Sequence, residues 1–555
     1  MHKIIKKTIK YTACGIGVLL LAIILFVSIL YFSADMLTPD YTPKANGELV
    51  QTDSLREYAG NYLRQSNSGL WELKVSGDAF QRGEAIGKLS SDLLYYQEKV
   101  FVDQIREIVP SDNYLKFLRF FIVLFNRNLG KNVPEEFRDE IYGISLSCTH
   151  EYDFIGTPYE RQLNYHSAHD LGHAMQDYML VGCSSFATWG ENSADSSLII
   201  GRNFDFYMGD KFAHNKLVSF YQPEQGYKFA SVGWPGMIGV LSGMNETGLT
   251  VTINAAKSDM PTASATPISI LTREILQYAS TIDEAYAIAL KRKTFVSESI
   301  LIGSARDGRA AIIEKSPEKT ALFTSGGNQI ICTNHYQSET FRNDKRNKEN
   351  IATSDSPYRF ARLQELLKEN NPIDPMKAAS ILRNQKGLDN IDLGMGNEMA
   401  INQLIAHHSV IFLPEKQIMY VSTSPWQCGK YMAYDLNKIF SDTIDFHHEI
   451  ATLNLTIPED NFIRQASYKQ FMAYKQLTKL IREKTQRKET IETKVLNLYE
   501  ASNPSFYYVY EVLGDYYAAI QQTDTAITYW QKALTMPIPK QAEKVRIQQK
   551  INKNQ

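Results

Sequence analysis

The chain has 555 residues, more than one hydrophobic core usually fills, so two or three folded units are expected. Hydrophobic residues make up 44% and charged residues 22%, an ordinary balance for a globular protein. A formal net charge of −2, without a long basic block, argues against a nucleic-acid partner, because phosphate binding needs a concentrated positive surface.

The first predicted element is an apolar helix near the N-terminus. Four lysines at positions 3, 6, 7 and 10 precede an uncharged 21-residue run from Thr12 to Phe32. A helix of that length can cross a bilayer. We therefore expect residues 1–35 to form a cytoplasmic basic tip and a retained single-pass membrane anchor. The lysines then stay inside, and everything after Phe32 lies on the periplasmic or extracellular face. A cleaved signal peptide is the alternative, although Tyr31 to Ala34 is a poor cleavage site.

Residues 36–182 are predicted to form a helical segment. Helical periodicity is clearest from Leu89 to Ile108 and from Tyr114 to Leu129. Glycine and proline residues then divide the segment into shorter pieces.

From Cys183 the pattern changes to short β-type runs, and two helices are expected at about Ile268–Lys291 and Tyr358–Lys368. Strands in runs, with helices grouped between them, predict an α+β layered domain over residues 183–455. The predicted strands are Ser197–Ile200, Lys216–Tyr221, Phe229–Gly233, Met237–Ser242, Leu249–Ile253, Ser299–Ser304, Ala310–Glu314, Thr320–Thr324, Gln329–Thr333, Ser409–Leu413 and Ile418–Ser422.

The tail, residues 456–555, is predicted to be helical. The stretch from Leu513 to Tyr517, followed by Ala526, Tyr529 and Pro537, fits one tetratricopeptide-type (TPR-like) helix pair. A degenerate earlier copy would end near Pro504. The tail is either a module that binds a protein partner or a helical appendage packed on the rest of the chain.

The five cysteines are scattered, at positions 14, 148, 183, 332 and 428, and no pair has metal-knuckle or redox spacing. One disulfide outside the cytoplasm remains open. Cys183 directly follows Gly182, at the boundary between the helical and the β-rich halves. Alone, it would be read as a buried structural cysteine. Three downstream motifs change that reading: Gly201-Arg202-Asn203-Phe204-Asp205-Phe206, Gly243-Met244-Asn245-Glu246-Thr247-Gly248-Leu249 and Thr333-Asn334-His335.

Together, these motifs resemble the penicillin-acylase-like branch of the N-terminal-nucleophile (Ntn) hydrolases, which includes isopenicillin N acyltransferase, acid ceramidase and choloylglycine hydrolase. The resemblance covers about Trp71 to Tyr434 and is closest to the acyltransferase-like members. It implies a four-layer αββα core and self-cleavage between Gly182 and Cys183. The released Cys183 would then be the catalytic nucleophile, with no cofactor.

The chemistry of such a site can be argued from the residues themselves. A thiol needs help to become a thiolate near neutral pH. Cleavage before Cys183 would place a free α-amino group on the nucleophile's own residue, and its unperturbed pKa of about 7.7–8.0 suits a general base. Gly182 helps because the absence of a side chain lets a strained, attackable turn form.

The resemblance also implies roles for four further residues. Asp205 would hold the α-amino group of Cys183 and Arg202 would orient the nucleophile, whereas the alternative for both is a salt bridge at a strand end. Asn254 and Asn334 match asparagines that accompany the oxyanion hole, where an amide can donate a hydrogen bond to the developing charge. Asn245 is better read as a turn residue.

Three other positions are candidates for the same site. Arg359 matches an arginine near the site in the family, and Arg362 is the competing choice. His335 and His408 are candidates for lining the substrate pocket, although a histidine at a strand edge is more often structural.

His166, His169, Asp170 and His173 form a cluster just before the cleavage point that has some features of a metal site. His169 and His173 lie four residues apart, which on a helix places both rings on one face. No glutamate lies between them in the zincin manner and no distant third ligand is evident, so no metal is predicted. A role in packing the precursor against the site is favoured.

The sequence thus predicts hydrolysis of a linear amide, with an N-acyl amine, an N-acyl amino acid or a lipid amide as substrate. The acyl group would pass to Cys183 as a thioester and then to water. Passing it to an amine instead would make the protein an acyltransferase, which the sequence cannot separate from a hydrolase. A rival from another class is a non-catalytic scaffold with a TPR-like tail and a relic hydrolase domain.

Overall fold

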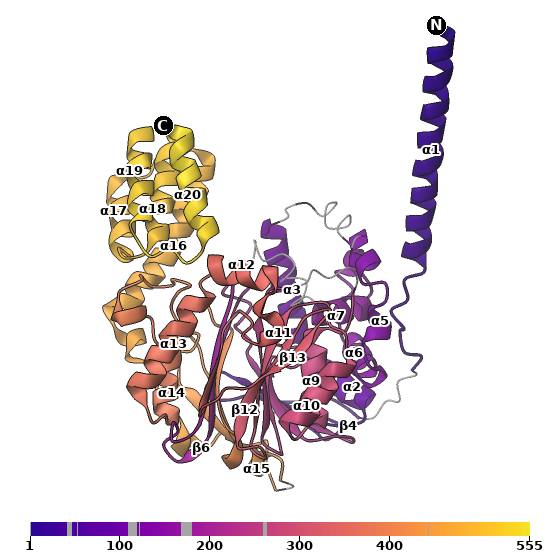
Figure 1. Cartoon of the computed structure of the whole chain (residues 1–555). Coiled ribbons are helices and arrows are strands. Elements are labelled where there is room, and N and C mark those ends of the chain that lie inside the picture. Colours follow the sequence, from indigo (N-terminus) through magenta and orange to yellow (C-terminus); the bar gives the residue numbers. More distant parts are fainter. Residues whose placement is uncertain are drawn as a thin grey trace.

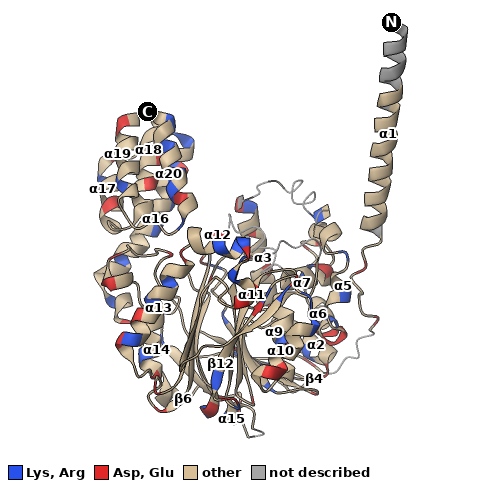
Figure 2. Ribbon diagram, viewed as in Figure 1, with Lys and Arg blue, Asp and Glu red and all other residues tan. Residues whose placement is uncertain are grey.

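The computed structural model describes residues 2–41, 47–52, 54–108, 111, 119–120, 122–167, 180–258, 264–441 and 443–555. The first element, α1 (His2–Phe32), stands apart from the body in Figure 1. Its stretch Cys14–Tyr31 is long and apolar enough to cross a membrane, and none of that stretch is buried. Figure 2 shows no charged residue on the part of α1 nearest the body. A membrane anchor and a signal sequence both fit this helix.

The larger of two β-sheets holds strands from both sides of the Gly182–Cys183 bond. Its strand order is β1-β2-β3-β4-β7-β8-β9-β10-β11-β12-β13. All neighbours are antiparallel except β4 and β7, which pair in parallel from Trp71 opposite Leu217. The strands are β1 (Val50–Gln51), β2 (Leu55–Tyr58), β3 (Asn61–Gln65), β4 (Trp71–Gly77), β7 (Leu217–Pro223), β8 (Phe229–Gly233), β9 (Ser242–Asn245), β10 (Leu249–Ala255), β11 (Glu298–Ser304), β12 (Arg309–Lys315) and β13 (Thr320–Phe323).

The smaller sheet carries Cys183 and is antiparallel throughout, in the order β14-β5-β6-β15-β16-β17. Buried side chains of β6, such as Ile200, share one hydrophobic cluster with Val218 and Phe220 of β7, so the two sheets pack face to face. The strands are β5 (Leu180–Gly190), β6 (Ser196–Tyr207), β14 (Gln329–Cys332), β15 (His408–Leu413), β16 (Ile418–Ser422) and β17 (Tyr431–Asp435).

Helices cover the outer faces of both sheets, which makes a mixed α/β fold (Figure 1). Leu363 and Ile381 of the α13–α14 pair pack on Phe186 and Ile411 of the smaller sheet. Helices α2, α6, α9 and α10 pack on the larger sheet. The helices of the body are α2 (Ala79–Leu89), α3 (Ser91–Ile108), α5 (Leu129–Asn132), α6 (Glu135–Ser145), α7 (Pro158–His166), α9 (Ile268–Tyr278), α10 (Ile282–Lys291), α11 (Glu339–Arg342), α12 (Lys345–Thr353), α13 (Ser356–Asn370), α14 (Pro375–Leu382) and α15 (Leu436–Ile439).

Most predicted strands after Cys183 agree with the structure to within a residue or two, and β8 has the predicted ends. The expected strand Met237–Ser242 is a loop, and β9 begins only at Ser242. The expected helix Ile268–Lys291 is two helices, because α9 stops at Tyr278 and Thr281 caps α10 by accepting a hydrogen bond from the Glu284 N–H.

The prediction that residues 36–182 are helical is corrected by four strands, β1 to β4. These strands are short, with two to seven residues each, and they gain their hydrogen bonds from each other and from β7. Such pairing is a tertiary effect that local helical periodicity does not register. The expected helix Tyr114–Leu129 lies partly outside the described residues.

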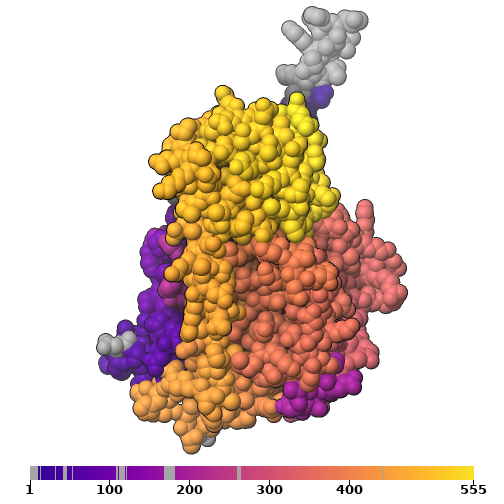
Figure 3. Space-filling model, turned by 90° about the vertical axis from the view of Figure 1, so that its left-hand side faces the viewer, coloured from indigo at the N-terminus to yellow at the C-terminus, as the bar shows by residue number. Residues whose placement is uncertain are grey.

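The tail is helical, as predicted, with α16 (Ala466–Arg487), α17 (Thr493–Ser502), α18 (Tyr507–Ala519), α19 (Thr523–Leu534) and α20 (Gln541–Asn554). It sits directly on the body (Figure 3). Asn503 exchanges two hydrogen bonds with the backbone of Met395, through the Met395 N–H at 2.9 Å and its carbonyl at 2.8 Å. Phe506 packs on Gly394, where any side chain would collide with it. The tail therefore holds the loop that runs from residue 391 to 407.

Candidate active site

Cys183 lies in β5, opposite Phe204 of β6. Its side chain is 1% exposed and belongs to the core cluster that also contains Phe204 and Phe206. Burial raises the pKa of the Cys183 thiol to about 11, although the nearby Arg202 guanidinium lowers it. With the backbone continuous through Gly182 and Cys183, the thiol is therefore protonated at neutral pH.

Two side chains hold the backbone of Cys183. Its N–H donates to Oδ1 of Asn334 at 3.0 Å, and its carbonyl accepts from Nη1 of Arg359 at 2.6 Å. Arg359 also donates to Asn334 Oδ1 at 2.7 Å and is anchored by Asp355 at 2.8 Å. Arg362, the competing choice, bonds instead to Glu365, Asn384 and Asn390. The structure thus brings Arg359, and not Arg362, to Cys183.

Arg202 is the charged group next to the thiol, with Nη2 3.8 Å from Sγ of Cys183. It is fully buried and donates further hydrogen bonds to the carbonyls of Leu241 and Ile253 and to the Ser242 hydroxyl. Its Cζ lies 4.3 Å from the centre of the Phe204 ring. This dense set of contacts fixes the guanidinium beside Sγ.

His408 contacts Arg202 and the Ser242 hydroxyl to which Arg202 donates. Its Nε2 lies 2.9 Å from the Ser242 hydroxyl and 3.3 Å from Nη1 of Arg202, and its Nδ1 lies 2.9 Å from Nδ1 of His407. Burial holds the pKa of His408 well below its usual value, so the ring is neutral. His408 is fully buried within this network, which fits a supporting role better than the pocket-lining role expected from the sequence.

Asp205 lies opposite Gly182 in β6. Side chains alternate along a strand, so its carboxyl group points to the face of the sheet opposite to the Cys183 thiol. It is fully buried, and neither oxygen has a hydrogen-bond partner among the described residues. Burial raises the pKa of Asp205 to about 8, against the opposing effect of Arg359 and Arg202. The partner that the sequence predicts for Asp205, the Cys183 nitrogen, is bonded to Asn334 in the uncut chain.

The two predicted oxyanion asparagines differ in their bonding. Asn254 of β10 accepts from the Ser185 hydroxyl at 2.8 Å and donates from Nδ2 to the Cys332 carbonyl at 2.8 Å. One Nδ2 hydrogen of Asn254 is therefore committed and a second remains. Asn334 donates from Nδ2 to the Ala255 carbonyl at 2.9 Å and uses Oδ1 as an acceptor toward Cys183. Its geometry thus fits an acceptor for the nucleophile's nitrogen.

His166 is buried and His335 is partly buried, and both contact polar neighbours. Nδ1 of His335 lies 2.8 Å from the Ser356 hydroxyl, and burial lowers its pKa to about 4. His166 accepts from the Ile238 N–H at 3.0 Å and contacts the Gln162 carbonyl at 2.7 Å. His169, Asp170 and His173 lie outside the described residues. Within the described ranges, no group of three or more His, Cys, Asp or Glu could hold a metal ion.

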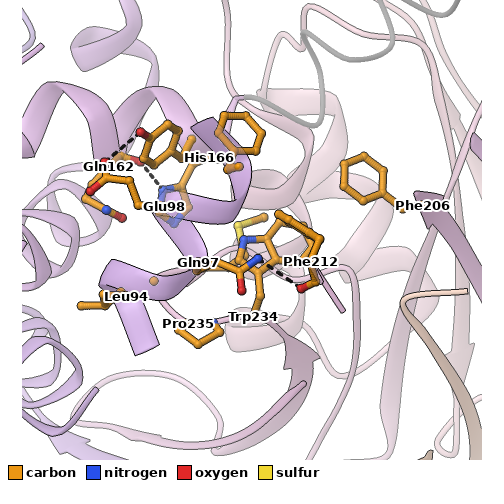
Figure 4. Close-up of a pocket in the computed structure, with 13 residues that line it drawn as sticks. Leu94, Gln97, Glu98, Gln162, His166, Phe206, Phe212, Trp234 and Pro235 are labelled. Atoms are coloured by element: carbon orange, nitrogen blue, oxygen red, sulfur yellow. Dashed lines mark hydrogen bonds between the residues drawn. The ribbon is translucent and has the colours of Figure 1, made fainter. Parts of the chain in front are cut away.

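An aromatic cavity of about 40 Å³ is lined by Phe206, Phe212 and Trp234 (Figure 4). Phe206 reaches it from the position two residues after Phe204, which faces Cys183. Phe212 meets Trp234 edge-on at 5.0 Å, and Phe101 completes the aromatic wall. Gln97, Glu98, Gln162 and His166 from α3 and α7 close the other side. Apart from Phe206 and His166, none of these residues lies in a motif that the sequence shows, because they come from separate segments of the chain.

A further neighbour that the sequence analysis missed is Gln403, in the loop before β15. Its side chain is 2% exposed and lies against Gly182. A Cβ atom built on Gly182 would lie 2.6 Å from Nε2 of Gln403, so a side chain at position 182 would displace the end of the Gln403 side chain. The Nε2 group has no hydrogen-bond partner among the described residues.

Comparison with known proteins finds a family model that matches the chain from a point after Cys183. Residues 190–403 match the family model for acyl-coenzyme A:6-aminopenicillanic acid acyl-transferase. An uncharacterized protein of Archaeoglobus fulgidus is 24% identical over 277 residues, which is 47% of this chain and 46% of that protein. Protein dcd1B of Dictyostelium discoideum is 23% identical over 271 residues, 45% of this chain and 51% of that protein. The chain thus spans about half the length of the curated relatives it matches.

Two solved structures are also similar in part. One is the Caenorhabditis elegans ortholog of N-acylethanolamine-hydrolyzing acid amidase, with 14% sequence identity and a TM-score of 0.32 over 42% of this chain and 93% of that chain. The other is the conjugated bile acid hydrolase of Clostridium perfringens, with 16% identity and a TM-score of 0.32 over 46% of this chain and 93% of that chain.

Proposed function

We propose that the chain cuts itself before Cys183 and then cleaves a linear amide with the Cys183 thiol, because residues 190–403 match the family model for acyl-coenzyme A:6-aminopenicillanic acid acyl-transferase. One observation carries the proposal. The Cys183 nitrogen is held at 3.0 Å by Asn334 while Sγ lies 3.8 Å from Arg202, so both the future amine and the thiol have fixed partners. Such preorganisation is what a nucleophile and its base require.

The proposal explains why the uncut chain would be inactive. The thiol pKa of about 11 keeps sulfur protonated, and the amide nitrogen of Cys183 cannot act as a base. Cleavage turns that nitrogen into an α-amine with an unperturbed pKa of about 7.7–8.0. Asn334 Oδ1 would orient the amine, and the Asp205 carboxylate, one strand away, would supply the compensating negative charge.

Turnover would then follow four steps. The amine takes the thiol proton, and the thiolate attacks the amide carbonyl of the substrate. The resulting oxyanion accepts a hydrogen bond from the second Nδ2 hydrogen of Asn254, while Arg202 stabilises the sulfur. The ammonium group returns its proton to the leaving amine, which departs and leaves a Cys183 thioester. Water, activated by the same amine, hydrolyses the thioester.

The aromatic cavity beside Phe206 suits a substrate with an apolar acyl group. An N-acyl amine, an N-acyl amino acid or a lipid amide would place its acyl chain between Phe101, Phe212 and Trp234. The aromatic wall favours such a chain through burial of its surface, while the polar groups lie on the opposite side of the cavity. The cavity of about 40 Å³ is small in the uncut chain, so the proposed substrate also needs the space that cleavage opens.

An acyltransferase is the second candidate, because the matching family model describes one. The residues would be identical up to the thioester, and an amine would replace water in the last step. Product ratios measured with and without added amines would separate the two activities. A rise in amide product at the expense of the free acid marks a transferase.

Intact-mass analysis of the purified protein tests the central proposal. Wild type should yield fragments of 182 and 373 residues, and Cys183→Ala should remain a single 555-residue chain without turnover. Labelling with an electrophilic substrate analogue should tag the new N-terminal Cys183. A wild-type enzyme that is fully active with an intact Gly182–Cys183 bond would falsify the mechanism.

The proposal also covers the N-terminal helix, the layers of the core and the helical tail. We assign residues 1–35 to a single-pass anchor and place residues 36–182, 183–455 and 456–555 outside the cytoplasm. The packing of α9–α10 and α13–α14 on two facing sheets supports a four-layer αββα core. The fit of Trp530 over Gly514 supports a TPR-like α18–α19 pair that could bind a protein partner.

A further inference from the structure

The side-chain amide of Gln403 is packed against the peptide bond that is proposed to break. Nε2 would lie 2.6 Å, Oε1 3.2 Å and Cδ 3.3 Å from a Cβ on Gly182, so the whole amide lies over this glycine. Gln403 is 2% exposed, and Nε2 has no partner among the described residues. A buried N–H without an acceptor is costly and rare, which suggests that an acceptor arrives at some stage.

The strand geometry shows on which side of the bond Gln403 lies. The N–H and carbonyl of Cys183 point away from β6, toward Asn334 and Arg359. In an antiparallel pair the neighbouring residue points the other way, so the N–H and carbonyl of Gly182 point toward Asp205 of β6. The Cys183 thiol lies on the face between the sheets. The Cβ direction of Gly182, and with it Gln403, lies on the opposite face.

This arrangement matches the demands of an N-to-S acyl shift. When Sγ of Cys183 attacks the Gly182 carbonyl carbon, it closes a five-membered ring with the atoms C, N, Cα and Cβ. As the carbon becomes tetrahedral, the oxygen bends away from the attacking sulfur. It therefore moves toward the face that carries Gln403. A donor there meets the oxygen only after charge has developed, which is the condition for lowering a barrier.

We propose that Nε2 of Gln403 donates a hydrogen bond to the oxyanion formed on Gly182 during self-cleavage. This assignment rests on the proposed function. It means that self-cleavage and substrate turnover use different hydrogen-bond donors for their oxyanions, Gln403 and Asn254. In the step, the S–C bond forms and the C–O double-bond electrons move to oxygen. The C–N bond then breaks, and the thiol proton passes to the Cys183 nitrogen. Water finally splits the Gly182 thioester into a carboxylate and the free thiol.

The loop around Gln403 is fixed, as an oxyanion donor requires. Asn402 accepts from the Leu404 N–H at 3.0 Å and donates to the Arg383 carbonyl at 3.2 Å. Leu404 is fully buried in the cluster formed with the tail helices. Gln403 is thus held between two anchored neighbours, so little reorganisation precedes the reaction.

Cleavage of the full chain made by in vitro translation tests the proposal, with intact mass followed over time. Gln403→Met keeps the length of the side chain but removes the N–H, and it should slow cleavage about 10²–10³-fold. Gln427→Met is the matched control, because Gln427 is also fully buried but donates to the Leu382 carbonyl. It should leave the cleavage rate unchanged. Thermal unfolding of both variants reports their folding.

The Gln403→Glu variant adds a second measurement, the pH dependence of the cleavage rate. This dependence would not change if Gln403 served only for packing. A carboxyl group has the shape of the amide and can donate a hydrogen bond only when protonated. The cleavage rate of Gln403→Glu, divided by that of wild type at each pH, should therefore rise as pH falls. Should Gln403→Met fail to fold, this profile decides alone. A flat ratio, or wild-type cleavage of Gln403→Met, overturns the role of Gln403, whereas wild type that stays uncut overturns the proposed function itself.

Discussion

The backbone N–H of Cys183 donates a 3.0 Å hydrogen bond to Oδ1 of Asn334. Arg359 donates to the same oxygen at 2.7 Å, which keeps it oriented as an acceptor. The nitrogen that would become the catalytic amine is therefore positioned before it is released. Cleavage then changes the chemistry of this nitrogen without requiring it to move.

Arg359 and Arg362 form a matched pair one turn apart in α13. Both are buried, but only Arg359 bonds to the Cys183 carbonyl. Arg359→Met should lower kcat/KM about 10- to 100-fold, the equivalent of a lost charged hydrogen bond. Arg362→Met should lower the melting temperature while the processed enzyme keeps its kcat/KM. Equal kinetic effects of the two substitutions would contradict the assignment.

The pKa of Asp205 predicts a pH effect on the uncut protein. Its pKa is raised from 3.8 unfolded to about 8 folded, so its contribution to stability is full below pH 4 and is lost as pH rises toward 8. In a Cys183→Ala background, Asp205→Asn should raise the melting temperature at pH 9 and leave it almost unchanged at pH 4. Exposed Asp195, whose pKa is lowered to about 2, is the control, and Asp195→Asn should bring no gain at pH 9.

Asn254→Ala should separate turnover from maturation. Loss of the substrate oxyanion donor should lower kcat about 10²–10³-fold while KM changes little. Self-cleavage should continue, because Gln403 serves the Gly182 carbonyl. Asn245→Ala is the control, since Asn245 accepts from the Thr247 and Leu249 N–H groups and shapes a turn. Fully processed Asn254→Ala with normal kcat would remove Asn254 from the mechanism.

Trp234 should set the length of the acyl chain. Trp234→Ala enlarges the aromatic cavity, so the preferred acyl chain should lengthen by several methylenes, each worth about 0.8 kcal/mol or roughly fourfold in kcat/KM. A series of N-acyl substrates of increasing length provides the measurement. Trp189→Ala, in the same strand as Cys183 but packed in another cluster, should keep the wild-type profile. An unchanged profile for Trp234→Ala argues against this cavity as the acyl site.

The N-terminal helix predicts on which side of the membrane the residues after Phe32 lie. Deleting residues 1–34 should release a soluble protein that still cleaves itself, because none of the stretch Cys14–Tyr31 is buried. In the full chain, protease added to the outer face of the cells should digest residues after Phe32. Protection from external protease would reverse the orientation inferred from the four lysines.

The sequence points to those residues of the candidate site that lie in short motifs. Arg202 and Asp205 follow Cys183 by about twenty residues on the next strand, so one hairpin aligns all three. Asn334 and Arg359 also reach Cys183, although the sequence suggested a different task for Asn334. Gln403 could not be predicted, because its contact with Gly182 joins segments more than 200 residues apart and its loop carries no motif. The burial of His408 is likewise visible only once β15 is paired with β6.

The hydrogen bonds between Asn503 and Met395 affect when self-cleavage can begin. The loop that contains Gln403 is braced by the tail helices α16 to α20, which the ribosome makes after this loop. Until those helices have emerged and folded, the loop lacks its support and the Gly182 carbonyl lacks its donor. The tail would thus delay self-cleavage until it has folded against the loop. A chain that lacks α16 to α20 would remain uncut and inactive, and only a chain that carries them would release a reactive thiol.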